Sequence, residues 1–284
     1  MTMHLILQGA PGQLPQLAQI GAIADPARAV ALGEGAMRFE DVDAGERVRA
    51  AVALAAWPAG VDATFIAAGR RLSDFKLLAM DMDSTLITIE CIDEIADMQG
   101  LKAQVAAITE AAMRGELDFG ASLTQRVALL AGLEAAALER VYEERLRLSP
   151  GAEALLAGVR GAGLQTLLVS GGFTFFTERQ QQRLGLDYSH ANVLEVRDGT
   201  LTGKVVGGIV DALEKKHTVA RTCAALGIAP QQAIVMGDGA NDLQMMGIAG
   251  LSVAFRAKPV VRAQADVALN FSGLDALLTI LSET

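Results

Sequence analysis

The sequence predicts an α/β protein in two parts. A small βαββαβ unit comes first, and a mostly parallel sheet wrapped by helices, with an inserted helical cap, follows. Over residues 1–72, apolar runs and helical stretches alternate in the βαββαβ order. Over residues 73–284, five short apolar runs are separated by helical stretches, which is typical of a parallel sheet covered by helices. The block 92–147 is helical throughout and too large for an ordinary connection between two strands, so it is predicted to be the cap.

The N-terminal unit, residues 1–72, contains four predicted strands and two predicted helices. The strands are expected at 4–8, 27–32, 36–42 and 61–67, and the helices at 14–24 and 45–56. Glycine-rich and proline-containing turns separate these elements. Their order is that of a ferredoxin-like fold, which many unrelated functions share. The polar segment 69–74 is expected to link this unit to the rest of the chain.

The larger unit, residues 73–284, is predicted from its short apolar runs. These runs lie at 75–80, 164–169, 233–236, 251–255 and 265–269. Within the cap, Gly100, Gly115 and Gly132 are well placed to end helices, because glycine readily takes the left-handed conformation found there. Two alternating runs around Asp198-Gly199 predict a hairpin over 192–206, packed either near the site or on the core.

Composition excludes several classes of protein. Hydrophobic residues make up 51% of the chain, which supplies a sizeable core and excludes a disordered chain. No run approaches the ~18 apolar residues of a membrane span, and the N-terminal residues lack the pattern of a secretory signal, so a cytoplasmic location is expected. A net charge of -9 without a basic block argues against a nucleic-acid surface. Cys91 and Cys223 match no metal-binding spacing, so both are expected to be buried, reduced thiols.

Polar residues follow three of the predicted parallel strands. Asp81 and Asp83 follow the first, Ser170-Gly171-Gly172 the second, and the segment GDGAND, residues 237–242, the third. Since ligands bind beyond the carboxyl ends of strands in such sheets, these segments are expected to meet. Two carboxylates at ~4 Å repel by about 4 kcal/mol at an effective dielectric of ~20. A hard divalent cation is therefore expected among them, and Mg²⁺ is the usual choice beside phosphate.

The same residues predict phosphoryl transfer. Ser170, the two glycine amides and Lys215 could bind phosphate oxygens, the amides by capping a helix N-terminus. Asp81 could attack phosphorus to give an aspartyl-phosphate, and Asp83, on the same side of the strand, could serve as acid and then base. Each motif alone is also a common turn, and only their joint placement at three strand ends favours catalysis.

These motifs resemble a known family. DMDSTLI, LLVSGG, the lysine of DALEKK and GDGAND are similar, in order and spacing, to the four motifs of the haloacid-dehalogenase-like (HAD) superfamily. The segments DMDSTLITIECIDEIA and MRGELDFGASLTQRVALL resemble more closely the phosphoserine phosphatase family within it. The resemblance covers residues 76–270 or so. It implies a HAD-like Rossmannoid core with a helical cap, to which related enzymes often add an ACT-like regulatory domain.

The resemblance also implies a role for each motif residue. Asp81 is implied as the nucleophile and Asp83 as the acid/base. Mg²⁺ would be held by the Asp81 carboxylate, the backbone carbonyl of Asp83 and the Asp238 carboxylate. The substrate phosphate would be bound by Ser170, Gly171, Lys215 and Asn241.

Substrate selection is implied by two residues of the cap region. Glu90 would bind the ammonium of phosphoserine and Arg126 its carboxylate. The implied reaction is hydrolysis of O-phospho-L-serine to L-serine and phosphate, the last step of serine biosynthesis. Lys258, just before a proline, is expected to be structural. The expected partner is a small molecule, without nucleic acid or membrane, and a homodimer through the N-terminal unit is a further expectation.

Two alternatives stay open at this point. The first is the same chemistry on another phosphorylated metabolite, or transfer to an acceptor other than water, such as homoserine. The second is a non-catalytic amino-acid sensor, in which the N-terminal unit binds an effector. The intact set Asp81, Asp83, Lys215 and Asp238 argues against a sensor, because crowded charges are costly to keep without a function.

Overall fold

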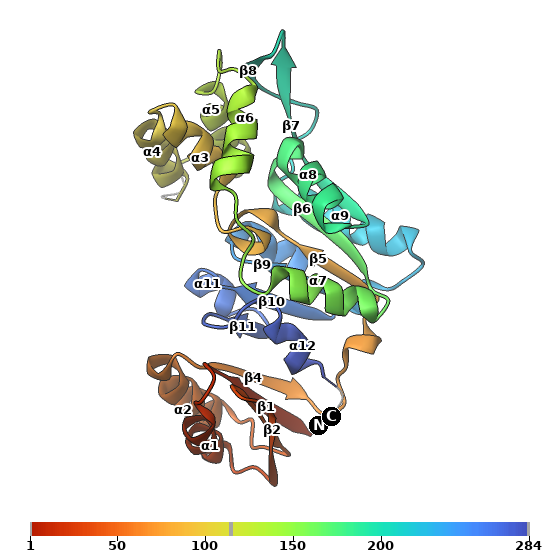
Figure 1. Ribbon diagram of the computed structural model, residues 1–284. Helices are drawn as coiled ribbons and strands as arrows, with labels where there is room; N and C mark the ends of the chain where they lie inside the picture. The colour runs from red at the N-terminus through yellow and green to blue at the C-terminus, as the bar shows by residue number, and fades with distance from the viewer. Residues whose placement is uncertain (1, 114–115, 283–284) are drawn as a thin grey trace.

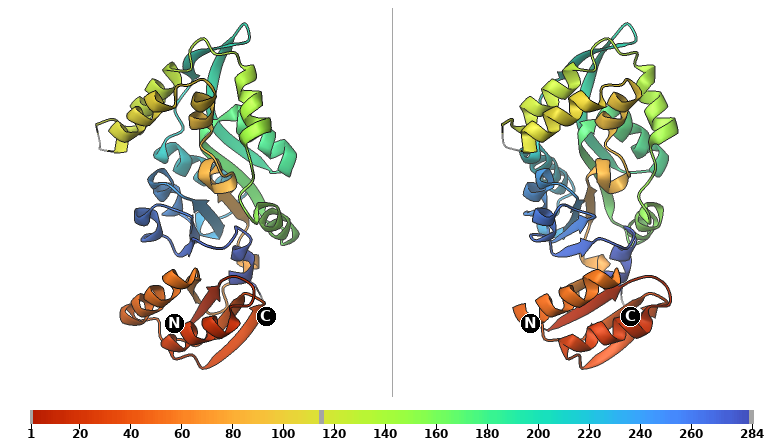
Figure 2. Two further views of the ribbon diagram at one scale, coloured as in Figure 1. Left: turned by 60° about the vertical axis from the view of Figure 1, so that its left-hand side comes forward. Right: turned by 90° about the vertical axis from the view of Figure 1, so that its left-hand side faces the viewer.

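The computed structural model describes residues 2–113 and 116–282. These residues form a four-stranded sheet of order β2-β3-β1-β4 and a seven-stranded sheet of order β11-β10-β9-β5-β6-β7-β8 (Figure 1). The smaller sheet lies at one end of the molecule and the helical cap at the other, with the larger sheet between them (Figure 2). The predicted fold class is confirmed. Among the described residues, no helix combines the length and apolar character needed to cross a membrane.

The N-terminal unit has the predicted βαββαβ order and an antiparallel sheet. Its elements are β1 (Met3–Gln8), α1 (Leu14–Gly21), β2 (Arg28–Gly33), β3 (Ala36–Glu40), α2 (Glu46–Ala56) and β4 (Asp62–Ala67). Alternate strand residues such as Leu5, Leu7 and Phe39 form a buried cluster with residues of both helices. At Gly21 a β-carbon would lie 2.1 Å from the Phe39 ring, so only glycine lets α1 approach the sheet this closely. The predicted boundary at residues 72 and 73 falls between β4 and β5, and it stays a prediction.

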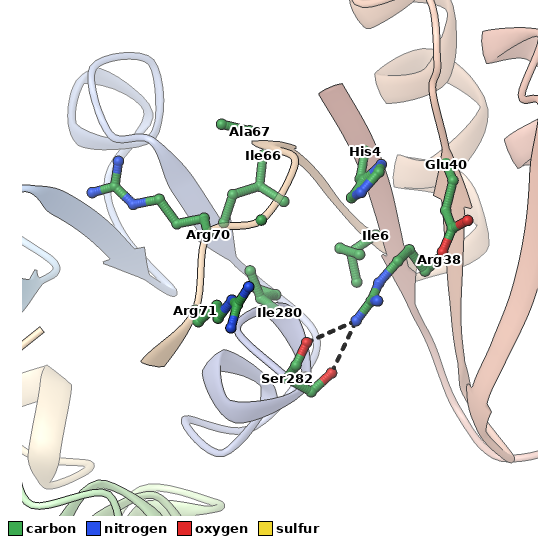
Figure 3. A pocket seen from close by; sticks show the side chains of 11 residues that line it. His4, Ile6, Arg38, Glu40, Ile66, Ala67, Arg70, Arg71, Ile280 and Ser282 are labelled. Atoms are coloured by element: carbon green, nitrogen blue, oxygen red, sulfur yellow. Dashed lines mark hydrogen bonds between the residues drawn. The ribbon is translucent and has the colours of Figure 1, made fainter. Parts of the chain in front are cut away.

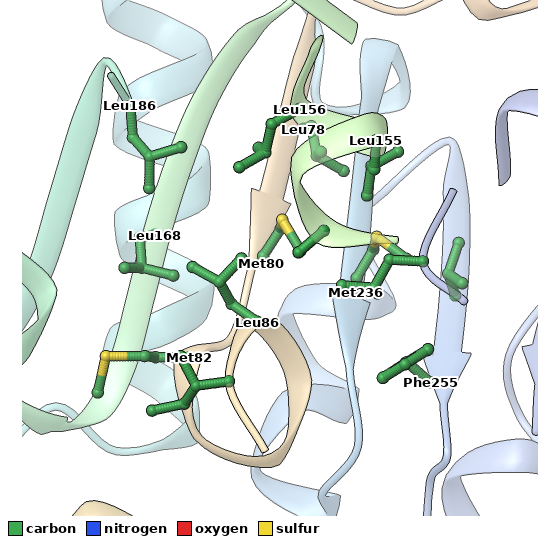
Figure 4. Close-up of a cluster of buried hydrophobic side chains, with 14 of the residues drawn as sticks. Leu78, Met80, Met82, Leu86, Leu155, Leu156, Leu168, Leu186, Met236 and Phe255 are labelled. Atoms are coloured by element: carbon green, nitrogen blue, oxygen red, sulfur yellow. The ribbon is translucent and has the colours of Figure 1, made fainter. Parts of the chain in front are cut away.

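The larger sheet is parallel from β11 to β7, and β8 is antiparallel to β7. Its strands are β5 (Leu77–Met80), β6 (Gln165–Phe173), β7 (Tyr188–Arg197), β8 (Thr200–Val206), β9 (Ala233–Gly237), β10 (Leu251–Phe255) and β11 (Val267–Leu269). Leu78, Met80 and Met236 point to one face, where they pack against Leu155 and Leu156 of α7 (Ala152–Gly161) (Figure 4). The alternate residues of the same strands, such as Leu77, Ala79 and Val235, face the opposite layer, where they cluster with residues of α9 (Ala212–Ala225).

Two strands extend beyond the predicted runs. The prediction ended one strand at residue 169, but β6 continues through the Ser-Gly-Gly segment to Phe173. The predicted hairpin began at residue 192, but β7 already begins at Tyr188 and pairs there with Leu167. Both extensions are polar or glycine-rich and have no apolar periodicity. The start of β7 is a strand because it pairs with residues 167–169 of β6, and β6 extends to Phe173 because its pairing with β7 resumes there opposite Asn192.

The cap lies between β5 and β6. Its helices are α3 (Cys91–Met98), α4 (Lys102–Met113), α5 (Phe119–Ala128) and α6 (Ala136–Arg140). Gly100 and Gly132 have the expected positive φ of 69° and 85°, whereas Gly115 lies outside the described residues. The β7–β8 hairpin packs on this cap, because Leu201 N–H donates to Leu133 O at 2.8 Å and Ala135 N–H to Gly199 O at 2.8 Å. The remaining helices are α8 (Thr174–Leu184), α10 (Leu243–Met246), α11 (Pro259–Arg262) and α12 (Ala276–Ile280).

Buried polar contacts attach the N-terminal unit to the core. Asp62, only 2% exposed, accepts backbone N–H bonds from Asn270 at 2.7 Å and Ser272 at 2.8 Å. The Arg38 guanidinium donates to Ser282 O at 2.9 Å, beside a cavity of about 490 Å³ between the sheet face and the C-terminal segment (Figure 3). Separating the two units would leave the Asp62 carboxylate and the Arg38 guanidinium without these hydrogen-bond partners. The unit is therefore docked on the core and not merely tethered to it.

Candidate active site

The carboxyl ends of β5 and β9 bring the predicted carboxylates together. The two strands pair in parallel with Met80 opposite Met236, and Asp81 N–H extends the ladder by donating to Met236 O at 3.0 Å. One carboxylate oxygen from each of Asp81, Asp238 and Asp242 lies within 4.8 Å of the others. The expected convergence of the first and third motifs is therefore present.

Lys215 balances part of the negative charge of these carboxylates. It projects from α9, is fully buried, and places Nζ 2.9 Å from Asp81 Oδ2 and 2.8 Å from Asp242 Oδ1. Burial opposes a charged ammonium, but the two carboxylates outweigh it and raise the pKa of Lys215 above its ordinary value. Lys215 is therefore a permanent cation that holds two carboxylates in place.

Asp242 organises the loop that carries Asp238. Its Oδ2 accepts the backbone N–H groups of Asp238 at 3.1 Å and Gly239 at 3.0 Å, while Oδ1 pairs with Lys215. At Gly237 a β-carbon would lie 2.3 Å from Asp242 Oδ2, so the loop closes this tightly only with glycine there. Asp242 is fully buried and engaged through both oxygens, whereas Asp81 and Asp238 line the cavity and are the carboxylates open to a metal ion.

The charge of these two carboxylates is only partly compensated. Burial raises the pKa of Asp81 well above its ordinary value; Lys215 opposes this shift, and the neighbouring carboxylates add to it. Burial, followed by repulsion from Asp242 and Glu90, raises the pKa of Asp238 to about 7. Hard oxygen donors with unbalanced negative charge suit a divalent cation such as Mg²⁺ or Ca²⁺. The residues present therefore fit the expected metal site.

Asp83 sits in a tight turn after β5. The turn is formed by Met82–Leu86, in which Ser84 has a positive φ of 55°. Asp83 Oδ1 accepts the Cys91 N–H at 3.2 Å, and the Ser84 hydroxyl donates to Glu90 Oε1 at 2.6 Å. Burial and then repulsion from Glu90 raise the pKa of Asp83 to about 7. At that pKa the group can both give and take a proton near neutral pH.

The end of β6 differs from the expected helix cap. α8 begins only at Thr174, and the Gly172 N–H donates to Ser170 Oγ at 2.9 Å, so the prediction that this amide caps a helix is wrong. Pairing of β6 with β7 shifts register between Val169 and Phe173. In this gap the Asn192 side chain donates to Gly171 O at 2.8 Å and stabilises the irregular backbone. Sequence reasoning missed Asn192, because its partners lie far from it along the chain.

The predicted residues surround one cavity of about 630 Å³ between core and cap. Its core wall includes Asp81, Asp83, Gly171, Asp238 and Asn241, and its cap wall includes Glu90 and Arg126. Ser170 and Lys215 are fully buried behind this wall. Each contacts a residue that lines the cavity: Ser170 Oγ accepts the Gly172 N–H, and Lys215 pairs with Asp81.

The cap wall combines opposite charges. Arg126 lies on α5. Burial lowers the pKa of its guanidinium, and the negative charges of Asp93 and Glu90 oppose this shift. Burial raises the pKa of Glu90, an effect opposed by the Ser84 hydrogen bond. Asp93, which the sequence did not single out, also lines the cavity, and so does Lys258, which was expected to be structural. Asp93 could have been noticed, because it lies three residues after Glu90 and hence on the same helix turn.

Comparison with known proteins identifies the family. The sequence model of the haloacid dehalogenase-like hydrolases matches residues 78–247, which include most of β5, the cap and all the predicted site residues. The chain belongs to this family. Like other haloacid dehalogenase-like hydrolases, it is an enzyme that contains a parallel sheet with helices on both faces.

Individual members of the hydrolase family are highly similar. A phosphoserine phosphatase of Polaromonas sp. is 62% identical over 216 residues, which are 74% of this chain and 92% of that protein. The crystal structure of a HAD family hydrolase from Salmonella enterica serovar Typhi has a TM-score of 0.88 at 33% identity, covering 100% of this chain and 99% of that one. A probable phosphoserine phosphatase from Vibrio cholerae, unliganded, has a TM-score of 0.83 at 34% identity, covering 99% and 86%. The similarity to these structures includes the N-terminal unit.

Proposed function

We propose that this hydrolase is a Mg²⁺-dependent phosphoserine phosphatase, which converts O-phospho-L-serine and water into L-serine and phosphate through an aspartyl-phosphate. The observation that carries the proposal is the single cavity between Asp81, Asp83 and Asp238 on the core and Glu90 and Arg126 on the cap. The high identity to phosphoserine phosphatases supports the choice of substrate. The reaction would be the last step of serine biosynthesis and would take place in the cytoplasm.

In the first half-reaction, a carboxylate oxygen of Asp81 attacks phosphorus. The new bond joins that oxygen to phosphorus, and the bond between phosphorus and the serine oxygen breaks. Asp83 gives its proton to the leaving oxygen, for which its raised pKa of about 7 is suited. In the second half-reaction Asp83 takes a proton from water, whose oxygen attacks phosphorus and releases phosphate and free Asp81.

Charge on the transferred phosphoryl group requires cations nearby. Lys215 contributes one positive charge at the Asp81 carboxylate, 2.9 Å away. When bound by Asp81, Asp238 and the backbone carbonyl of Asp83, Mg²⁺ would supply Lewis-acid stabilisation of the phosphoryl oxygens. The proposed phosphate ligands on the protein are Ser170, Gly171, Lys215 and Asn241.

The cap residues account for substrate selection. The planar Arg126 guanidinium can bind a carboxylate through two parallel hydrogen bonds, and the Glu90 carboxylate, which lines the same cavity, can bind an ammonium. Because both line the same cavity as Asp81, they would orient the serine part while its phosphate reaches the nucleophile.

Arg126→Ala is therefore expected to change specificity. The kcat/KM for phosphoserine should fall by about 100-fold, because one charged hydrogen-bonding partner of the substrate is lost. The kcat/KM for p-nitrophenyl phosphate, which has no carboxylate, should change by less than about 3-fold. Arg140→Ala, which removes an exposed arginine elsewhere on the cap, is the control. Parallel losses on both substrates would refute the substrate role of Arg126.

Metal binding is expected to weaken as pH falls. In the folded protein the pKa of Asp238 is raised to about 7, so protons compete with the metal ion for this carboxylate below that pH. For the same reason, the free energy of unfolding of the metal-free protein declines as pH rises from about 4 to about 7. Mg²⁺ should therefore raise the melting temperature more at about pH 8 than at about pH 5.5. Thermal unfolding with Mg²⁺ and with chelator measures this difference. An equal shift at both pH values would contradict the assignment of the ion to these carboxylates.

Phosphate release tests the proposed function directly. The expected result is Mg²⁺-dependent release from phosphoserine, with much slower release from phosphothreonine and sugar phosphates. Chelator should abolish it. Preference for another phosphate ester, or transfer to added homoserine, would replace the proposed reaction with a related one. No release from any ester at saturating Mg²⁺ would favour the sensor alternative.

The expected homodimer is a separate question. Sedimentation of the full chain measures its oligomeric state.

A further inference from the structure

The Asp83 carboxylate is contacted by both the cap and the core. Cys91, the first residue of α3 and fully buried, donates its backbone N–H to Asp83 Oδ1 at 3.2 Å. Burial, followed by the charge of the neighbouring Asp83 carboxylate, raises the pKa of the Cys91 thiol, which keeps a protonated thiol beside that group. On the other side, a β-carbon at Gly172 would lie 2.6 Å from Asp83 Oδ2, so β6 passes directly against that oxygen. Asp83 is thus confined between the first turn of the cap and a strand of the core.

We propose that Cys91 is a positioning residue, which orients the Asp83 carboxyl group so that Oδ2 presents the catalytic proton to the leaving oxygen. The proposal rests on the acid/base role given to Asp83 in the proposed function. Because Oδ1 already accepts the Cys91 N–H, a proton on Asp83 is favoured on the other oxygen, Oδ2. That oxygen lies beside Gly172, which lines the cavity where the leaving group must sit.

The position of Cys91 allows its two donors to be removed separately. As the first residue of the helix, it has no carbonyl partner for its N–H within α3. Proline is favoured at this helix position, and the preceding Glu90 has the extended conformation (φ -96°, ψ 107°) that a following proline requires. Cys91→Pro therefore removes both donors, Cys91→Ala removes only the thiol, and Cys91→Ser replaces the thiol by a hydroxyl donor.

The experiment measures kcat/KM for a series of substituted phenyl phosphates with increasingly basic leaving groups. This parameter reports the steps up to phosphoenzyme formation, in which Asp83 acts as the acid. A weakly basic nitrophenolate leaves without a proton, whereas a basic leaving group needs one. In Cys91→Pro the loss should grow along the series, from less than about 3-fold to about 100-fold. Cys91→Ala should lie between it and the wild type, and Cys91→Ser should recover most of the loss.

Phenyl phosphates lack an ammonium and a carboxylate, so loss of a substrate contact with Glu90 would not produce this trend. Glu90 also raises the pKa of Asp83 by repulsion, and Cys91→Ala, which adds no proline after Glu90, controls for a displacement of that charge. Glu46→Pro, a proline at the first residue of α2 in the N-terminal unit, is the control for introducing proline. Equal losses for all leaving groups would overturn the proposal and indicate a merely structural role. If Cys91→Pro does not fold, the Cys91→Ala and Cys91→Ser pair decides in the same way. Failure of the wild type to hydrolyse phosphoserine would instead refute the proposed substrate, while the phenyl phosphate series still tests Cys91.

Discussion

Asp81→Asn should lower phosphoserine turnover by about 10⁴-fold or more, because a neutral amide is a poor nucleophile and cannot form the acyl phosphate that the carboxylate forms. The fold should persist. Asparagine keeps the shape of aspartate, and its oxygen can still accept the Met82 N–H that Asp81 Oδ1 now accepts at 2.7 Å. Phosphate release measures the activity, and circular dichroism measures the melting temperature.

A trapping experiment makes the Asp81 test specific for covalent catalysis. Rapid acid quenching of the wild type with labelled phosphoserine should yield phosphorylated protein, and the Asp81→Asn variant should yield none. Asp25→Asn, which changes an exposed aspartate of the N-terminal unit, is the matched control. Appreciable turnover by Asp81→Asn in a folded protein would rule out the aspartyl-phosphate.

Lys215→Met is expected to destabilise the fold by about 3–5 kcal/mol, measured as the free energy of unfolding in urea with chelator present. The substitution leaves Asp81 and Asp242 buried without the cation that now lies 2.9 Å and 2.8 Å from them. The loss should be larger at about pH 8 than at about pH 5, because at lower pH the unpaired carboxylates can be protonated.

Lys216→Met controls for the change of side chain, because Lys216 is only half-buried on the same helix. Combining Lys215→Met with Asp81→Asn should recover part of the lost stability, since the double variant buries one unpaired charge fewer. Similar unfolding free energies for the two lysine variants would mean that this ion-pair network contributes little to stability.

Much of the candidate site could be predicted because it depends on local order. The apolar run that becomes β5 is followed directly by Asp81 and Asp83, and the run that becomes β9 by Asp238. Parallel strands place their carboxyl ends at one edge of a sheet, so these residues had to converge. The helical character of the cap and the βαββαβ order of the first unit were likewise visible as local periodicity.

The contacts that hold this site in its geometry were not predictable from such patterns. Asp242 pairs with Lys215 across 27 residues of sequence, and Asn192 bridges Gly171 and Val210. None of these contacts leaves a periodic signal, because each depends on how separate elements pack.

The sequence by itself determined the fold class, the order of strands and helices, and which carboxylates end which strands, since these follow from the spacing of apolar and polar residues along a single segment. Only the tertiary structure decided that β6 continues to Phe173, that Cys91 holds Asp83, and that Asp62 docks the N-terminal unit on residues 270–272. Those outcomes arise from hydrogen bonds between segments up to 210 residues apart, whose partners become neighbours only when the chain is folded.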